Sequence, residues 1–134
     1  MSNMDKNTKI VSFTDLNSWQ EGHKFVLMVY GVTKKFPKEE LFCLTNQIRR
    51  ASISITSNIA EGFSRPSYKD KTYLYTVSLG SLTETQNQLI LSKDLGYVPI
   101  KDFNNLFEQS VVTSKLINGL IKKSRTYYTP IHNS

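Results

Sequence analysis

Few residues in this chain have the chemistry and spacing of a catalytic or metal-binding site. Its two histidines are His23 and His132, and no Glu-x-x-His pair supplies the ligands of a ferritin-like di-iron centre. His23 falls on the apolar stripe expected for the first helix, so we interpret it as a core or boundary residue. We therefore predict no metal site and no cofactor.

The remaining candidates for catalysis are one thiol and one pair of carboxylates. Cys43 stands between Phe42 and Leu44, which predicts a buried or half-buried thiol rather than a nucleophile. Glu61 and Glu84 could form a carboxylate pair, but we expect them on different helix faces, on opposite sides of a turn. Since no glycine-rich loop follows a strand either, the sequence predicts a protein without enzymatic activity.

Basic residues point to binding rather than catalysis. The 134 residues include 17 Lys and Arg against 11 Asp and Glu, a formal net charge of +6 that permits binding to nucleic acid or an acidic partner. In a bundle with up-down topology, the turn after the second helix shares one end with the close of the fourth helix. That end would carry a basic rim of six candidate nucleic-acid-binding residues: Arg65, Lys69, Lys71, Lys122, Lys123 and Arg125.

A further cluster, Lys34, Lys35 and Lys38, is expected at the first turn, at the opposite end of the bundle. The alternative interpretation of these clusters is a solvated surface, with Lys and Arg favoured near helix C-termini. No groove-reading motif is present. Binding to nucleic acid should therefore use phosphate contacts and be independent of sequence.

Four helical segments are expected to position these residues, at about 16–35, 37–61, 67–95 and 100–123. Pro37 separates the first two, Gly62 is a candidate stop for the second, and Gly96 closes the third. Ser67 with Asp70 resembles a capping box. No segment has the pattern of a strand. The prediction is an all-α, antiparallel up-down-up-down four-helix bundle over 15–125, with a flexible N-terminal segment 1–14 and a flexible C-terminal tail 126–134.

The second and third helices each carry more apolar surface than one bundle core needs. In the second helix the expected core stripe is Leu41, Leu44, Ile48, Ala51, Ile55 and Ile59. Beside it runs a second stripe, and the third helix has one as well. A wide apolar sector predicts a second partner surface, and the small residues at 51, 52, 54 and 57 would let another helix approach closely. The candidate oligomer interface is Phe42, Ile53, Ala60, Tyr73, Val77 and Leu91.

Each second stripe contains one charge. Arg49 interrupts the stripe of the second helix, and Glu84 lies within that of the third. A carboxylate in an apolar stripe is costly unless it is paired, so we predict a structural ion pair between Arg49 and Glu84. The alternatives are a pair between Arg50 and Glu84, or two solvated residues at the rim.

Five short motifs occur together along the chain: Phe36-Pro37-x-Glu39, Gln47-x-Arg49-Arg50, Ser54-Ile55-x-x-Asn58-Ile59-Ala60-Glu61-Gly62, Gly80-Ser81-Leu82-x-Glu84 and Leu95-Gly96-Tyr97. Taken together, these motifs resemble the four-helix bundle family first noted in intervening sequences of 23S ribosomal RNA genes. The resemblance spans Phe13 to about Arg125 and implies a homopentamer without known enzymatic activity. A distant relative by fold is the accessory protein of diversity-generating retroelements, which binds reverse transcriptase and nucleic acid; that relation is an analogy of fold.

Two functions remain open after this reading. The first is a homo-oligomeric bundle that binds RNA, DNA or a nucleoprotein partner, and the second is a protein–protein scaffold with no nucleic-acid role. The N-terminus is polar, and no stretch approaches the roughly 20 apolar residues of a membrane span. We therefore expect a cytoplasmic protein that associates with copies of itself and makes no contact with a membrane.

Overall fold

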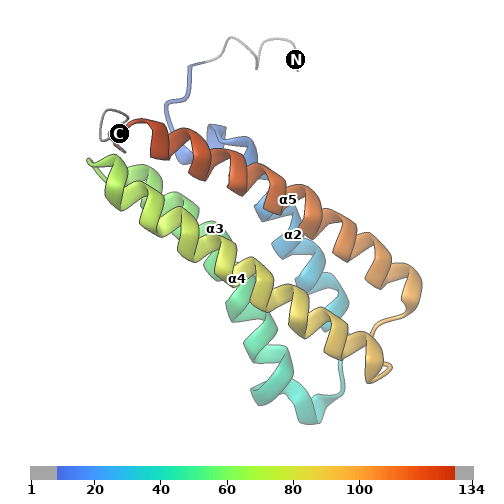
Figure 1. Cartoon of the computed structure of the whole chain (residues 1–134). Coiled ribbons are helices and arrows are strands. Elements are labelled where there is room, and N and C mark those ends of the chain that lie inside the picture. The colour runs from blue at the N-terminus through green and yellow to red at the C-terminus, as the bar shows by residue number, and fades with distance from the viewer. Residues whose placement is uncertain (1–8, 129–134) are drawn as a thin grey trace.

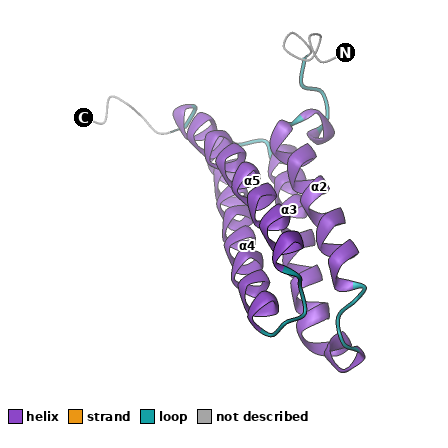
Figure 2. Cartoon of the chain, turned by 90° about the vertical axis from the view of Figure 1, so that its right-hand side faces the viewer, coloured by secondary structure: helices purple, strands orange, loops and turns teal. Residues whose placement is uncertain are grey.

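The computed structural model describes residues 9–128 and consists mainly of four long helices (Figure 1). The helices are α2 (Asn17–Thr33), α3 (Asn46–Ser64), α4 (Tyr68–Asp94) and α5 (Ile100–Thr126). Three short helical turns complete the described chain: η1 (Phe13–Asp15), η2 (Lys38–Glu40) and η3 (Leu41–Thr45). Within this range there is no strand, as Figure 2 also shows. The four predicted helices and the all-helical class are confirmed.

Neighbouring helices pair their residues in reverse order. The Ser78 hydroxyl of α4 donates to the Ile55 carbonyl of α3 at 2.7 Å, whereas Gly62, near the end of α3, lies against Tyr75, closer to the start of α4. Likewise the hydroxyls of Thr72, early in α4, and Ser124, late in α5, lie 2.7 Å apart. Because α2 packs on both α3 and α5, the four helices surround one core (Figures 1 and 2).

The core follows the apolar periodicity in three of the helices, and only in part in α2. Ile48, Ile55, Leu82 and Ile117 are fully buried. For α2 the periodicity predicts a core stripe of Leu16, Trp19, Val26, Leu27 and Tyr30. Val26 is buried, and Leu16 and Trp19 pack against the core, but Leu27 is 59% exposed. The buried apolar residues of α2 are Phe25, Val26 and Val29, which pack between the neighbouring helices.

Small hydroxyl residues occupy many buried positions between the helices. Ser52 and Ser78 are completely buried, and Ser54 of α3 forms a 2.8 Å hydrogen bond with Ser81 of α4. Small side chains allow close approach of two backbones, and a bonded hydroxyl avoids the cost of burying an unpaired polar group. The small residues expected to let another helix approach closely therefore serve mainly α3–α4 packing within the chain. Ala51 is buried there too, and Ser57 alone of that set is exposed.

The second helix does not begin as a regular α-helix at residue 37. A 3₁₀ turn is followed by the π-helical turn η3, in which the Glu40 carboxylate accepts a hydrogen bond from the Leu44 amide at 3.3 Å. A π-turn holds more residues than an α-turn, so side chains before it point in directions that a continuous α-helix does not predict. For this reason Leu41, predicted in the core, is 48% exposed, and Cys43, predicted to be buried or half-buried, is exposed.

The predicted helix-end signals at Ser67 and Gly96 are confirmed, but the one at Gly62 is not. The Ser67 hydroxyl accepts a hydrogen bond from the Asp70 amide at 3.1 Å and caps α4, and Gly96, with φ of 83°, follows its end. Gly62 is not a stop, because α3 continues to Ser64. A Cβ at Gly62 would lie 2.7 Å from the Tyr75 ring, so this glycine permits close packing of α3 on α4.

The predicted flexible segments 1–14 and 126–134 are described only in part, because 1–8 and 129–134 lie outside the described residues. Within the described part, Ser12 and Asp15 form a capping box around η1. The backbone amides of Ser12 and Val11 lower the pKa of Asp15. Phe13 and Thr14 belong to η1, and Thr126 is the last residue of α5.

Candidate nucleic-acid interface

The start of α4 and the end of α5 lie side by side, next to the turn that joins α3 to α4 (Figure 1). The rings of Tyr68 and Tyr127 stack across this contact with centroids 4.7 Å apart. The structure thereby brings the six predicted basic residues to one end of the bundle. We call this the basic end, and it comprises Arg65, Lys69, Lys71, Lys122, Lys123 and Arg125.

Two of these six residues are engaged within the chain. Arg65 forms an exposed ion pair with Glu61 at 2.6 Å, of the kind that contributes about 1 kcal/mol or less. The Lys71 amine donates to the Phe63 carbonyl at 2.6 Å and lies over the Phe63 ring. Burial lowers the pKa of Lys71. The other four are exposed and take part in no ion pair formed by the described residues: Lys69, Lys122, Lys123 and Arg125.

A cavity of about 260 Å³ opens at the basic end. Tyr75 forms part of its wall, and burial raises the pKa of Tyr75 to about 12. This cavity could not be predicted from the sequence, because its walls come from four separate parts of the chain: the residues before α2, and α3, α4 and α5. The aromatic residues near the basic clusters were the one signal available. Its charged and aromatic lining consists of Phe63, Tyr68, Lys71, Tyr75, Lys123 and Tyr127.

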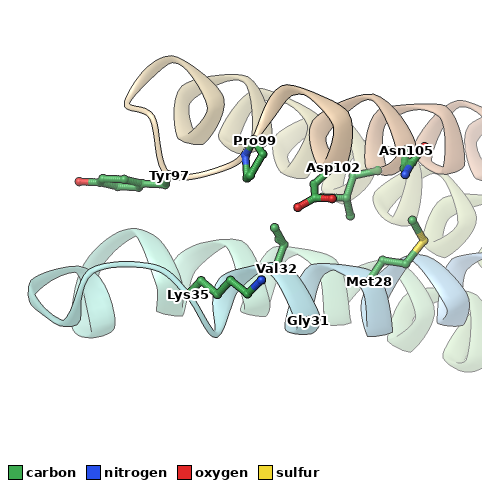
Figure 3. Close-up of a pocket in the computed structure, with 9 residues that line it drawn as sticks. Met28, Gly31, Val32, Lys35, Tyr97, Pro99, Asp102 and Asn105 are labelled. Atoms are coloured by element: carbon green, nitrogen blue, oxygen red, sulfur yellow. The ribbon is translucent and has the colours of Figure 1, made fainter.

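The opposite end carries charges of both signs. We call it the mixed end, and it comprises Lys34, Lys35, Lys38, Glu39, Glu40 and Asp102. A cavity of about 280 Å³ lies there between α2 and α5, with Lys35 and Asp102 on its two sides (Figure 3). The Tyr97 hydroxyl donates to the Glu40 carboxylate at 2.9 Å, and this bond raises the pKa of Tyr97.

The predicted ion pair between Arg49 and Glu84 is wrong for the single chain. Arg49 faces α2, where its Nε donates to the Thr33 hydroxyl at 2.8 Å and its guanidinium lies 4.6 Å from the centroid of the Tyr30 ring. Glu84 is exposed and accepts a long hydrogen bond of 3.4 Å from Gln88. The two charges lie on opposite flanks of α3, so an intramolecular pair cannot form.

The alternative partner, Arg50, lines the same shallow depression as Glu84, between α3 and α4. Ala51, Ser54 and Ser81 are among the other residues that line it. Arg50 and Glu84 form no ion pair in the described part of the chain. Both are exposed. The third interpretation, that Arg49 and Glu84 are solvated rim residues, fits Glu84 but not Arg49, which bonds to Thr33.

Apolar side chains remain exposed on the outer faces of α3 and α4. Phe42, just before α3, is 86% exposed, and Tyr73 of α4 is 67% exposed. Ile53 and Leu91 are also exposed, while Ala60 and Val77 are half-buried. All six candidate interface residues therefore have surface available for a partner.

The residues that could have supported catalysis or metal binding lie apart. His23 is exposed, and its ring stacks on Trp19 with centroids 4.7 Å apart, so its predicted place in the core stripe is wrong. Over residues 9–128 no group of three His, Cys, Asp or Glu could hold a metal ion, and His132 lies outside that range. No helix in the same range has an apolar stretch long enough to cross a bilayer.

Fold and surface together define a helical-bundle protein with one basic end and exposed apolar helix faces. Residues 14–119 match the family model of the 23S rRNA-intervening sequence protein, and the chain belongs to this family. Among solved structures it is similar to a protein with unknown function from the S23 ribosomal protein family of Bacteroides thetaiotaomicron VPI-5482. The two are 24% identical with a TM-score of 0.73, over 78% of this chain and 95% of the other, which shows a shared fold. No curated protein matches the chain.

Proposed function

We propose that the chain is a non-enzymatic bundle module that binds the phosphate backbone of RNA or DNA through its basic end. The observation that carries this proposal is the side-by-side placement of the start of α4 and the end of α5. Lys69, near the start of α4, and Lys122, Lys123 and Arg125, near the end of α5, are all exposed. Phosphates are the natural partners of such a cluster, since each contact releases condensed counterions.

Binding through phosphates should depend steeply on salt and little on base sequence. The expected slope of log affinity against log salt is about −0.7 for each phosphate contact to a single strand and about −0.9 to a duplex. Fluorescence anisotropy with labelled RNA and DNA of several sequences, repeated at increasing salt, measures this slope. An affinity that is flat with salt, or that changes strongly with sequence, would contradict the proposal.

We further propose that the module assembles as a homo-oligomer, with five subunits as the expected number. Support comes from the exposed apolar side chains on α3 and α4, led by Phe42 and Tyr73. Exposed apolar patches of this kind mark association surfaces. A ring would repeat the basic end around its circumference and raise avidity for a long nucleic acid. Light scattering should give about five times the mass of the chain, and a stable monomer at micromolar concentration would overturn this part.

The same apolar surfaces also favour the second candidate function, a scaffold for partner proteins without any nucleic-acid role. The two functions separate in one experiment. An intact oligomer that retains neither RNA nor DNA at low salt supports the scaffold and rejects the phosphate-binding proposal.

A further inference from the structure

The cavity at the basic end combines aromatic walls with lysine amines. Phe63, Tyr68, Tyr75 and Tyr127 supply rings, Lys71 and Lys123 supply positive charge, and no carboxylate of residues 9–128 lines it. Its volume of about 260 Å³ suits a small planar group rather than a side chain of a bulky partner. The lining therefore selects a ligand with a flat apolar body and an attached anion.

Lys71 is positioned to meet such an anion. Its amine lies 5.2 Å from the centroid of the Phe63 ring and 5.8 Å from that of Tyr68. Among the described residues it donates one hydrogen bond, to the Phe63 carbonyl, and an ammonium group has three N–H donors. The remaining donors have no partner in residues 9–128 and can meet a ligand. Burial, which lowers the pKa of Lys71, leaves its charge incompletely solvated, and a nearby anion would compensate for the lost water.

The rings provide a platform for the flat part of the ligand. Tyr68 and Tyr127 stack on each other at an interplanar angle of 30°, which fixes both rings. Tyr127 remains 58% exposed, so part of this pair is open to a ligand, while Tyr75 at 3% exposure closes the inner wall. Nucleobases stack on such side chains with little regard to their identity.

We propose that this cavity takes one unpaired nucleobase together with its phosphate, so that the basic end prefers single strands to duplexes. Bases inside a duplex are paired and stacked on one another and cannot enter a cavity unless they are extruded. The inference rests on the proposed nucleic-acid binding and adds to it a preference for unpaired strands. A free mononucleotide carries the same chemistry, and the experiment distinguishes the two sources.

The test compares a labelled short oligouridylate with a duplex of the same length at one salt concentration. Wild type should bind the single strand more tightly than the duplex. Tyr127→Ala should weaken single-strand binding by roughly 5-fold to 100-fold, the effect of removing one stacking platform, while duplex binding stays unchanged. Tyr127→Phe keeps the ring and should restore the preference. Tyr128→Ala is the matched control, since Tyr128 does not line the cavity, and it should behave as wild type.

Circular dichroism checks that each variant keeps its helices. If Tyr127→Ala loses helix content, the Leu120→Trp variant is tested in its place. Leu120 lines the cavity, and the larger Trp side chain should fill it and weaken single-strand binding in the same way. The cavity inference would be overturned if wild type bound single strand and duplex equally, or if Tyr127→Ala weakened the binding of both to the same extent. Either result would leave the phosphate-binding proposal intact.

If wild type binds neither the single strand nor the duplex, the proposed function fails. Calorimetry then tests separately whether the cavity binds a mononucleotide. Binding of uridine monophosphate but not of inorganic phosphate would support a mononucleotide site there. Absence of heat from both would overturn the site as well.

Discussion

Both ends of the bundle carry a cluster of basic residues, but the two clusters differ in what surrounds them. At the mixed end, Lys34, Lys35 and Lys38 share the surface with Glu39, Glu40 and Asp102. At the basic end, Lys122, Lys123 and Arg125 follow one another along a stretch of α5 that carries no carboxylate. The net field at the mixed end is therefore small, whereas the basic end presents a positive surface.

Tyrosines show the same contrast. At the mixed end the Tyr97 hydroxyl donates to the Glu40 carboxylate, so the ring is fixed within the chain. At the basic end Tyr68 stacks on Tyr127 beside Lys71, and no acid of the described residues lies among the cavity walls. A count of lysines would not separate the two ends. The placement of carboxylates separates them, and it supports the proposed binding at the basic end.

The largest expected effect on stability comes from a Gly→Ala substitution at the basic end, compared with a matched substitution at the mixed end. Gly62→Ala places a Cβ 2.7 Å from the Tyr75 ring and 3.2 Å from Leu74, which forces a shift in a packed contact at the basic end. Overpacking of this kind costs about 1–3 kcal/mol in the free energy of unfolding. At the mixed end, a Cβ at Gly31 meets nothing within 4 Å, and Gly31→Ala should stabilise α2 by about 0.5–1 kcal/mol. Urea denaturation measures both, and equal effects would contradict the packing role of Gly62.

The next effect concerns how α2 and α3 are joined near the mixed end. Arg49→Met removes the hydrogen bond to Thr33 and the contact with Tyr30, and should destabilise the chain by about 1–2 kcal/mol. Glu84→Gln changes an exposed residue and should move stability by less than about 0.5 kcal/mol. The double variant should equal the sum within about 0.5 kcal/mol. A clear recovery in the double variant would show that the two charges interact, contrary to this structure.

The smallest effect at neutral pH is expected for Tyr75→Phe, since the change becomes visible only in alkali. The pKa of Tyr75 is about 12 in the folded chain, above the unfolded value of 10.0. Between these values the unfolded state binds fewer protons, so stability falls as pH rises from about 10 to 12. Tyr75→Phe should reduce this fall, and Tyr73→Phe, an exposed control, should not. Thermal melts across this pH range check the difference, and identical profiles for both variants would refute it.

Most of the fold could be predicted from the sequence because its signals are local. The cap at Ser67 and the glycine at Gly96 fixed the limits of α4, and the apolar period located the buried faces of three helices. The exposure of Leu27 in α2 could not be predicted, because several apolar stripes on this helix are nearly equivalent. Leu27 and Phe25 both suit a core, and packing against α3 and α5 decides that Phe25 is buried.

The basic end was predictable from topology alone, since up-down connections bring residues 65–71 and 122–125 together. The partner of Arg49 could not be predicted, because it depends on the flank of α3 from which the side chain projects. The π-turn η3 was missed for a similar reason: no residue between Leu41 and Thr45 has a signal for it, and it arises from Glu40 reaching both Leu44 and Tyr97.

The central claim, that the basic end and not the mixed end binds nucleic acid, has one direct test. Two triple variants remove the same charge: Lys122, Lys123 and Arg125 to Gln at the basic end, and Lys34, Lys35 and Lys38 to Gln at the mixed end. The first should weaken binding to all single strands alike and lower the salt slope by about 2, while the second should leave the slope near that of wild type. Equal slopes in the two variants, or retention of full affinity by the first, would contradict the account.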